Sequence, residues 1–460
     1  MSEIIEAFAP PRIQVYTAEW VLPVSSPPIS DGAVIIKDDR IAFVGSQAEL
    51  RARPEIAQAD VTSFGRAAIL PGFVNTHSHL ELTLMRGFLE DLAFRDWIMK
   101  LTRTKYERLT AEDFKWSARL GAAEAIRAGI TTLADTGDSG APFDALLASG
   151  LRGIAYREVF GPDPKNSGSN FDDLKVKVAD MRARENKRVR AGVSPHAPYT
   201  VSANLFRQVS QYAARESIDM CIHAAESETE RQLMLAGEGD FARGLSARGI
   251  EWPTPGISTI QYLDSLGVLE CAPLLVHAVT VDDRDIASIA RSRARVAHCP
   301  KSNAKLGHGI ARLSDMLDAG VRVGLGTDSV ASNNRCDMLD EARFCCLVHR
   351  AARRDFNWPT AERALRLMTL DGARALGLES EIGSLEVNKQ ADLIVIDLAR
   401  VHNTPVHDPT AAIIFSAASS DVLLTMVAGV ILFEGHRVHT LAENEISDHI
   451  AVALDKMSSS

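Results

Sequence analysis

The sequence has no stretch of 18 or more consecutive apolar residues, which is the length that a transmembrane helix requires. Its first residues, MSEIIEAFAPPRIQVY, contain acidic residues and prolines, whereas a secretory signal peptide has basic residues followed by an apolar run. We therefore expect a protein that does not span a membrane and carries no such signal.

Cysteines are few, and basic residues form no run. The six cysteines are scattered without the spacing of a disulfide framework and without a CxxC motif, which indicates reduced thiols in the cytoplasm. Asp and Glu (60) outnumber Lys and Arg (50), and the formal net charge of −10 is spread along the chain. Without a basic stripe, neither nucleic acid nor an anionic membrane is expected as a partner.

What the sequence does contain is an ordinary globular composition, with 46% apolar and 24% charged residues. A chain of 460 residues with this composition is expected to form one large domain and a smaller satellite. Residues 13–68 carry short strand patterns separated by Gly, Pro and Asp, and the same pattern returns after residue 383. Two strand-rich ends around a different middle predict a small β-sandwich built from both chain ends.

The middle of the chain alternates apolar strand patterns with longer helical patterns. Eight strands with helices between them are what a closed parallel (β/α)8 barrel, the TIM barrel of the α/β class, requires. The strand candidates are AILPGFVNTH, TTLADTG, GIAYREVF, RAGVSPH, DMCIHAA, LLVHAV, ARVAHCP and RVGLGTD. The predicted division is residues 1–68 and 384–440 for the sandwich, 69–383 for the barrel, and 441–460 for a terminal helix and tail.

One long segment interrupts this alternation. Residues 226–267 contain Gly and Pro, follow a strand end and lie where a substrate would enter a barrel. Segments of this length are usually functional lids or ordered excursions, and the sequence leaves both interpretations open.

Histidines and one aspartate stand at the ends of the predicted strands. The first strand ends in HSH at 77–79, and alternation along a strand places both imidazoles on one face. His223, His277 and Asp328 close three other strands at their carboxyl ends, where barrel enzymes place catalytic groups. A single buried histidine is often a satisfied core residue, but this number of them at strand ends indicates a metal site.

The residue types at these strand ends suit Zn²⁺ or Fe²⁺, and the absence of thiolate ligands favours a catalytic over a structural metal. A catalytic site leaves a position for water, whose pKa a bound metal lowers toward neutrality. Replacing an amino group on a nitrogen ring also needs a proton carrier. Glu226, three residues after His223, is a candidate, although the acidic run ESETE taken alone favours a solvated carboxylate.

Several longer motifs point to one group of proteins: LPGFVNTHSH, SPHAPY, HAAE, HCPKSNAKLGHG, LGTDSVASNN and the tail GSLEVNKQADLIVID. With them the sequence resembles the amidohydrolase superfamily from about residue 30 to 435. More narrowly, it resembles the branch of methylthioadenosine/S-adenosylhomocysteine deaminases, aminodeoxyfutalosine deaminases, guanine deaminases and s-triazine hydrolases. The resemblance implies a barrel with a composite β-sandwich, one divalent metal (usually zinc, with iron as the alternative), and hydrolytic deamination of a nitrogen heterocycle.

The resemblance also implies roles for the residues at the strand ends. Glu226 becomes the proton shuttle between water and a ring nitrogen, and Asp328 takes the first proton of the water. His277 is expected to polarise the attacking water or its adduct, and His298 of the HCP motif to support the site from behind. Because no lysine stands at a strand end where two-metal relatives keep a carboxylated one, a single metal is expected. Its implied ligands are His77, His79, His223 and Asp328.

Three further residues are implied to meet the substrate. His196 in SPHAPY matches a histidine that contacts substrate in the nucleoside deaminases. Trp97 matches an aromatic residue near the base, and Arg157 corresponds to an arginine that touches the ligand. Core packing for Trp97 and a surface ion pair for Arg157 are the alternatives.

One position departs from the resemblance. Methylthioadenosine deaminases hold a ribose-binding glutamate just before an RLT motif, but here Tyr106 stands there and Glu107 follows it. Glu81, close after the metal-binding strand, is another candidate for the ribose, with Arg86 or solvent as its alternative partner. Because a phenol is a weaker partner for a diol than a carboxylate, the sequence favours aminodeoxyfutalosine, then methylthioadenosine, S-adenosylhomocysteine or adenosine.

The benzoate of aminodeoxyfutalosine would need a cation, for which Arg157 and Lys105 are the candidates. Two other interpretations stay open: hydrolysis of guanine, 8-oxoguanine or an s-triazine on the same fold, or a non-catalytic scaffold, against which the intact ligand set argues. A homo-oligomer is expected by analogy with relatives. The other zinc deaminase architecture is excluded because the sequence has no PCxxC motif.

Overall fold

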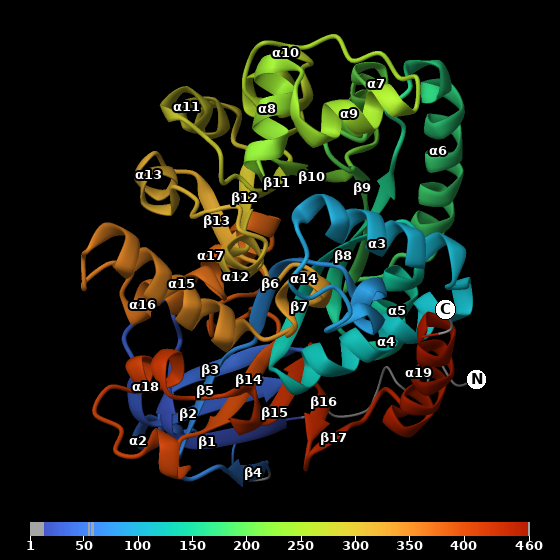
Figure 1. Cartoon of the computed structure of the whole chain (residues 1–460). Coiled ribbons are helices and arrows are strands. Elements are labelled where there is room, and N and C mark those ends of the chain that lie inside the picture. The colour runs from blue at the N-terminus through green and yellow to red at the C-terminus, as the bar shows by residue number, and fades with distance from the viewer. Residues whose placement is uncertain (1–12, 54–55, 57–58, 459–460) are drawn as a thin grey trace.

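Two sheets organise the residues that the computed structural model describes, which are 13–53, 56 and 59–458. One is an eight-stranded parallel barrel, and the other is a nine-stranded mixed sheet. In Figure 1 the blue and red ends of the chain share the lower sheet, and the middle of the chain forms the barrel above it. No helix in the described ranges is long and apolar enough to cross a membrane.

All eight strand patterns of the middle segment form barrel strands that neighbour one another in chain order. A parallel bridge between Ser78 and Asp328 joins the last strand end to the first and closes the barrel. Apolar side chains such as Val74, Tyr156 and Val276 fill the interior. The strands are β6 (Phe73–Ser78), β7 (Ile130–Gly137), β8 (Arg152–Val159), β9 (Val189–Pro195), β10 (Asp219–Ala224), β11 (Leu274–His277), β12 (Arg295–His298) and β13 (Arg322–Leu325).

Helices and short 3₁₀ turns follow these strands. Polar N-caps begin several of the helices, as where Thr110, Asp282 and Asp337 accept backbone N–H groups of the first turn. The helices are α3 (Phe94–Glu107), α4 (Ala111–Arg127), α5 (Ala141–Ser149), α6 (Ser167–Ala183), α7 (Ala203–Glu216), α8 (Glu228–Ala236), α9 (Gly239–Ala247), α10 (Thr259–Ser265), α11 (Asp283–Ser292), α12 (Pro300–Lys305), α13 (Leu313–Asp318), α14 (Val330–Asn333), α15 (Met338–Arg353), α16 (Ala361–Leu367) and α17 (Leu370–Leu376).

The mixed sheet combines strands from both ends of the chain, as the sequence predicts. The two halves join where β5 (Ala67–Pro71) pairs antiparallel with β14 (Leu393–Asp397), and a hairpin between residues 29–46 turns at Asp38, whose φ is 58°. Its strands are β1 (Ile13–Val21), β2 (Ile29–Lys37), β3 (Arg40–Ser46), β4 (Asp60–Ser63), β5 (Ala67–Pro71), β14 (Leu393–Asp397), β15 (Val422–Val427), β16 (Val430–Glu434) and β17 (Arg437–Val438). The helices beside it are α2 (Gln47–Arg51), α18 (Pro409–Phe415) and α19 (Glu443–Ser458).

One predicted strand is two strands in the structure. The AILPGFVNTH pattern divides at Gly72, with β5 in the mixed sheet and β6 in the barrel. A side chain at position 72 would collide with Thr131, so glycine allows the chain to pass closely between the two sheets. Apolar runs look alike in both sheets, and the sequence pattern therefore does not show the break.

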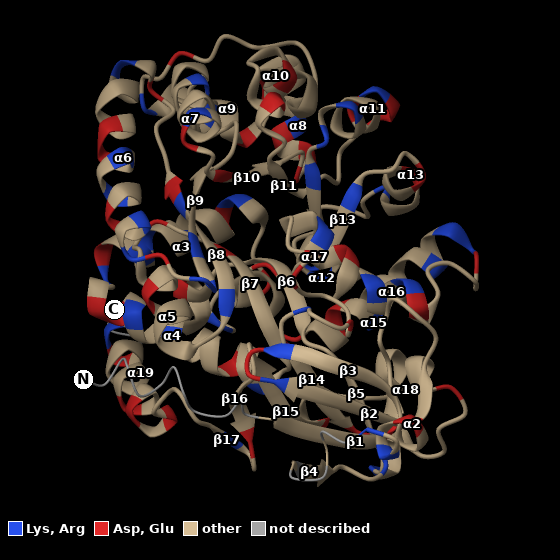
Figure 2. Ribbon diagram, turned by 180° about the vertical axis from the view of Figure 1, so that it is seen from behind, with Lys and Arg blue, Asp and Glu red and all other residues tan. Residues whose placement is uncertain are grey.

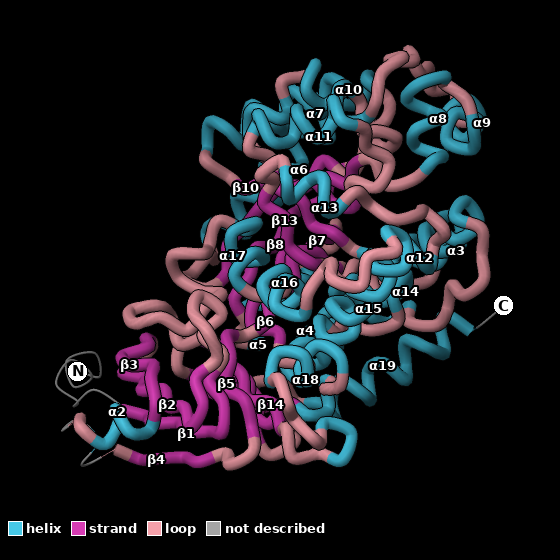
Figure 3. Tube along the Cα trace, turned by 90° about the vertical axis from the view of Figure 1, so that its left-hand side faces the viewer, coloured by secondary structure: helices cyan, strands magenta, loops and turns pink. Residues whose placement is uncertain are grey.

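The long segment 226–267 is an ordered excursion that contains α8, α9 and α10. Phe241 of α9 stacks on Tyr199 with ring centroids 4.0 Å apart and packs edge-on against Phe94 of α3 at 6.1 Å. Figure 3 shows α3 on the same side of the barrel as α8 and α9. The excursion and α3 therefore meet beside the carboxyl ends of the barrel strands.

Charges of both signs are mixed over the molecule. Figure 2 shows Lys and Arg interspersed with Asp and Glu along the helices and loops of the face it presents. Many of these residues form short-range ion pairs along a helix, such as Lys177 with Asp173 and Arg184 with Asp180. Such a surface agrees with the charge pattern of the sequence.

Candidate metal centre and active site

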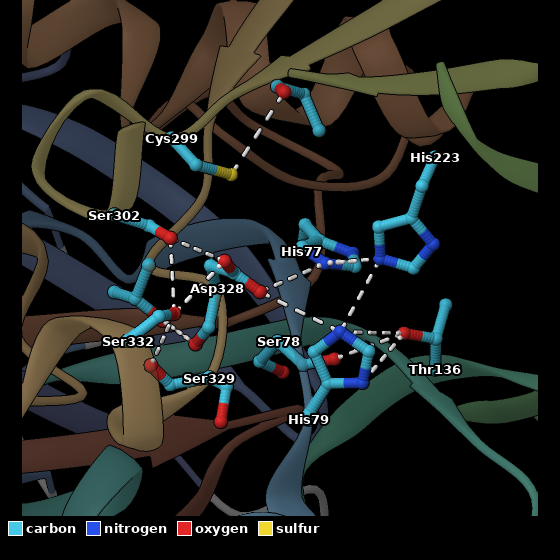
Figure 4. A network of polar contacts seen from close by, with 12 residues as sticks. His77, Ser78, His79, Thr136, His223, Cys299, Ser302, Asp328, Ser329 and Ser332 are labelled. Carbon is cyan, nitrogen blue, oxygen red and sulfur yellow. Dashed lines mark hydrogen bonds and ion pairs between the residues drawn. The ribbon is translucent and has the colours of Figure 1, made fainter. Parts of the chain in front are cut away.

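Four side chains from the ends of three barrel strands converge on one point, and Figure 4 shows them facing one another. The Nε2 atoms of His77 and His79 each lie 3.3 Å from Nε2 of His223. Asp328 Oδ1 lies 3.3 Å from His77 Nε2 and 3.5 Å from His79 Nε2. These separations match the edges of a tetrahedron around a zinc ion with bonds of about 2.0–2.1 Å, so the donor set fits a divalent metal.

Burial prepares these groups for metal binding. It lowers the pKa of His77 to about 4 and, together with neighbouring histidines, that of His79 and His223 to about 3. All three are therefore neutral near pH 7, which is the form of imidazole that binds metal. Burial would raise the pKa of Asp328, but the hydrogen bond with His77 and the neighbouring imidazoles outweigh it and hold the pKa well below its usual range.

Hydrogen bonds behind the centre orient the imidazoles. His79 Nδ1 lies 3.1 Å from the Thr136 hydroxyl, and His223 Nδ1 lies 3.2 Å from the backbone oxygen of His196. With these nitrogens occupied, the Nε2 atoms face the common point. Such outer contacts fix the orientation of metal-binding histidines.

The carboxylate of Asp328 is held by two hydroxyl groups and by an unusual backbone conformation. Ser302 and Ser332 donate hydrogen bonds of 2.5 and 3.0 Å to its Oδ2, which leaves Oδ1 for the histidines. Its φ is 59°, and positive φ also occurs at two other strand ends of the site, at Ala225 and His277. Left-handed backbone is uncommon outside glycine and recurs at functional sites, where it aims side chains.

Glu226 lies beside this centre among aromatic and imidazole side chains. Its Oε1 is 3.5 Å from His277 Nε2 and 3.4 Å from His308 Nε2, and the Tyr199 hydroxyl donates to Oε2 at 3.4 Å. Burial would raise the pKa of Glu226, but His277 and a hydrogen bond from His308 outweigh burial and lower the pKa to about 2. His277 Nδ1 lies 2.9 Å from Asn303 Oδ1, which orients the ring. Glu226 is thus an ionised carboxylate beside the centre near pH 7.

A second glutamate, Glu230, fixes the backbone that carries Glu226. Its carboxylate accepts the backbone N–H groups of Ala225 and Glu226 at 3.0 and 2.8 Å and the Thr259 hydroxyl at 2.7 Å. Burial raises the pKa of Glu230 to about 7. The acidic run ESETE is therefore not a solvated face, because two of its three glutamates are buried.

The residues that the sequence analysis missed lie mostly inside motifs that it used only to recognise the resemblance. His308 and Asn303 belong to HCPKSNAKLGHG, and Tyr199 closes SPHAPY. Glu230 lies in ESETE, and no spacing rule marks it as a backbone acceptor.

The three residues implied to meet the substrate lie in different surroundings. His196 lies against His223 at the mouth of the barrel, with the two rings tilted by 33° and their centroids 4.7 Å apart. Trp97 packs in an apolar cluster with Leu84 and Met85, as in the alternative interpretation. Arg157 is buried rather than on the surface, on the face of β8 that points to the helices and away from the barrel interior.

His298 also faces outward. Its Nε2 lies 3.0 Å from His349 Nε2 on α15, and Cys345 lies beside the two histidines. Alternation along β12 turns Ala297 and Cys299 into the barrel and His298 toward the helices. Among the described residues, no hydrogen bond or ion pair joins the His298 side chain to the four residues of the metal centre, so its expected support of that site stays a prediction.

Near α3, two of the candidate ribose contacts, Glu81 and Tyr106, take part in a cluster of ion pairs and hydrogen bonds. Glu81 is 1% exposed and lies 2.5 Å from Lys105 Nζ, which is also 2.6 Å from Asp138. The Tyr106 hydroxyl donates to Asp138 at 2.6 Å. Glu107 forms a surface ion pair with Arg103 at 3.0 Å, directed away from the cluster.

The partner of Glu81 is therefore not Arg86, which pairs with Glu124 instead. Burial alone would lower the pKa of Lys105, but the charges of Glu81 and Asp138 outweigh it and raise the pKa above its ordinary value. Because Lys105 is already paired with two carboxylates, it is a poor partner for a carboxylate of the substrate.

Stability should depend on pH through Glu341, a buried residue that supports the loops carrying Ser302 and Asp328. Its carboxylate accepts the Lys301 backbone N–H at 2.9 Å and the Asn333 amide at 2.8 Å, and burial raises its pKa to about 8. Because the folded-state pKa lies above the unfolded value, this stabilisation is complete below about pH 4.5 and is lost as the pH rises through about 8.

Urea unfolding from pH 5 to 9 should therefore show a shallower fall in the free energy of unfolding for Glu341→Gln than for the wild type. The difference across this window should be on the order of a few kcal/mol. The exposed Glu362→Gln, on α16, serves as the control and should follow the wild type. Identical slopes for Glu341→Gln and wild type would refute the assignment.

The fold and this centre can now be compared with known proteins. Residues 68–432 match the amidohydrolase family. A curated 5-methylthioadenosine/S-adenosylhomocysteine deaminase of Moorella thermoacetica is 35% identical over 438 residues, which cover 95% of this chain and 97% of that protein.

Two solved structures superpose on nearly the whole chain. A zinc-bound adenosine deaminase from Xanthomonas campestris superposes with a TM-score of 0.85 at 26% identity, over 97% of this chain and 99% of that chain. An aminofutalosine deaminase from Helicobacter pylori, at 21% identity and a TM-score of 0.78 over 91% and 100% of the two chains, shares the fold. The chain belongs to the amidohydrolase family.

Proposed function

We propose that this protein is a metal-dependent hydrolase that removes the amino group of an adenine-ring nucleoside as ammonia. The observation that carries the proposal is the buried carboxylate of Glu226 beside a cluster of three neutral imidazoles and one carboxylate at a single barrel end. The Moorella relative, named a nucleoside deaminase and similar over nearly the whole chain, supports the same reaction class.

The metal would be held by the side chains that converge on one point, and zinc is proposed before iron because the Xanthomonas relative was solved with zinc. When bound, a divalent metal acts as a Lewis acid and brings the pKa of water toward neutrality. The proposed ligands are His77, His79, His223 and Asp328.

The residues of the chain itself supply the proton transfers. Water adds to the ring carbon that bears the amino group, and its two protons leave by different routes. Asp328 is proposed to accept the first proton, and Glu226, an ionised carboxylate beside the centre, to take the second and deliver it to the adjacent ring nitrogen. The proton on Asp328 then passes to the amine, which leaves as ammonia while the carbon–nitrogen bond breaks and the carbonyl forms. His277, held by Asn303, is proposed to stabilise the charge that develops on the adding oxygen.

The positions of two cations argue against the substrate order that the sequence favours, in which aminodeoxyfutalosine comes first. A preference for aminodeoxyfutalosine needs a cation for its benzoate, but Lys105 is paired with Glu81 and Asp138, and Arg157 faces the helices. We therefore propose adenosine and its 5′-substituted forms, such as methylthioadenosine and S-adenosylhomocysteine, ahead of aminodeoxyfutalosine. The named activity of the Moorella relative supports this order.

Ammonia release from five amino-substituted compounds, together with chloride release from atrazine, tests the proposal. Methylthioadenosine, S-adenosylhomocysteine, adenosine, aminodeoxyfutalosine, guanine and atrazine should be compared by kcat/KM with zinc-loaded protein. The adenosine compounds should be preferred by at least about tenfold, which is a difference of about 1.4 kcal/mol in transition-state stabilisation. A preference for guanine or atrazine would overturn the nucleoside proposal, and no turnover of any compound would favour a scaffold.

We also propose a cytoplasmic location, which the six free cysteines support because reduced thiols persist in that compartment. A homo-oligomer remains a prediction by analogy. Light scattering of the purified protein would give its assembly state.

A further inference from the structure

One buried carboxyl group at the barrel mouth has no role in the proposed chemistry. Glu158 lies near the end of β8 and is 8% exposed. Strand alternation turns it inward with Ile154 and Tyr156, which belong to the barrel interior, while Arg157 faces the helices. The Oε1 atom of Glu158 is fully buried and has no hydrogen-bond partner among the described residues.

This carboxyl group lies next to the proposed metal centre. One of its oxygens and ring nitrogens of His196 and His223 all lie within 4.8 Å of one another. A ligand whose ring reaches the centre must therefore pass close to Glu158. The position is on the substrate side of the barrel rather than in its packed core.

The neighbouring charges do not satisfy Glu158. Burial raises the pKa of Glu158 well above its ordinary value, because Lys105, the cation that would lower it, is bound at 2.5 Å by Glu81 and at 2.6 Å by Asp138. Of Glu81, Asp138 and Glu158, only Glu158 has an oxygen without a hydrogen bond within the described ranges. A buried acceptor without a partner is unfavourable, and a donor from a ligand would relieve it.

We propose that Glu158 is a specificity-determining residue that binds the vicinal hydroxyl groups of the substrate's ribose. The inference rests on the proposed nucleoside deaminase function. A nucleoside presents ring nitrogens that are mostly acceptors, whereas its ribose presents two adjacent hydroxyl donors. A neutral carboxyl group matches such a pair, because its carbonyl oxygen accepts from one hydroxyl while its O–H donates to the other.

Removing the diol from the substrate and the carboxyl group from the protein tests this contact as a pair. For wild-type enzyme, kcat/KM should be about 30-fold higher for adenosine than for 2′,3′-dideoxyadenosine, as expected for the loss of two neutral hydrogen bonds. In Glu158→Leu, that ratio should fall below about threefold with the metal content unchanged, whereas Glu158→Gln, which keeps one donor and one acceptor, should retain most of it. Glu270→Gln, an exposed glutamate between α10 and β11, serves as the control and should keep the wild-type ratio.

The outcomes separate the inference from the proposed function. A full wild-type ratio in Glu158→Leu would overturn the role of Glu158 while leaving nucleoside deamination in place. No deamination of either nucleoside by wild-type enzyme would overturn both. If the Glu158 variants fail to fold, binding to wild type decides: inosine should bind at least about tenfold tighter than 2′,3′-dideoxyinosine, and equal affinities would refute a diol contact.

Discussion

Replacing Glu226 by glutamine should leave the metal content intact and reduce turnover at least ~10²–10⁴-fold, the usual range for losing a general acid–base group. The amide has nearly the same shape but cannot accept and return a proton. The loss should be at the upper end or beyond, because ammonia is proposed to leave only from an adduct whose ring nitrogen has received its proton from Glu226. The measurement is kcat for adenosine together with elemental analysis of the same sample.

Glu228→Gln is the matched control for this prediction. Glu228 lies two residues further along the same acidic run, is exposed, and pairs with Arg231 at 3.0 Å. It should keep nearly the wild-type rate. A Glu226→Gln enzyme that retained more than about a tenth of the wild-type rate would show that another group carries the proton.

His77→Ala should release the metal and abolish turnover. His77 lies in the middle of the site, 3.3 Å from both His223 and Asp328. Its loss therefore removes one proposed ligand and a contact that holds each of the other two in place. Elemental analysis should give about one metal per wild-type chain and a small fraction of that in the variant, as expected when one ligand of a four-donor site is lost. His402→Ala, with an exposed imidazole paired to Asp421, should keep the metal.

The cluster of His298, Cys345 and His349 provides a stringent check on this stoichiometry. Its ligand-type atoms lie within 4.8 Å of one another, but the contact of the two histidines is already explained as a hydrogen bond. Two metals per wild-type chain, with one lost in His349→Asn, would contradict a single-metal enzyme.

The barrel and the convergence of His77, His79, His223 and Asp328 could be predicted because both follow from local features of the sequence. Each strand is a short apolar run, and a polar residue at its carboxyl end is automatically placed at the barrel mouth. The prediction needed no knowledge of which strands are neighbours. Strand patterns alone do not show whether an apolar run serves one sheet or two, which is why the break at Gly72 was missed.

Contacts between distant segments could not be predicted in the same way. Lys105 meets Glu81 and Asp138 only after α3 folds across the ends of β6 and β7, so the sequence offered both Lys105 and Glu81 as substrate contacts. The inward position of Glu158 could be predicted from the sequence, because alternation along β8 places it on the opposite face from Arg157. The resemblance indicates Arg157 and does not indicate its neighbour.

Deamination in oxygen-18-labelled water tests the central claim most directly. Zinc-loaded enzyme should convert adenosine to inosine, with one ammonia released per nucleoside and one labelled oxygen at the ring carbon that carried the amino group. Mass spectrometry of the product and an ammonia assay measure both quantities in one reaction. Ammonia and singly labelled inosine in equal amounts would establish hydrolytic deamination. Unchanged adenosine, or loss of the ribose with the amino group still on the ring, would contradict it.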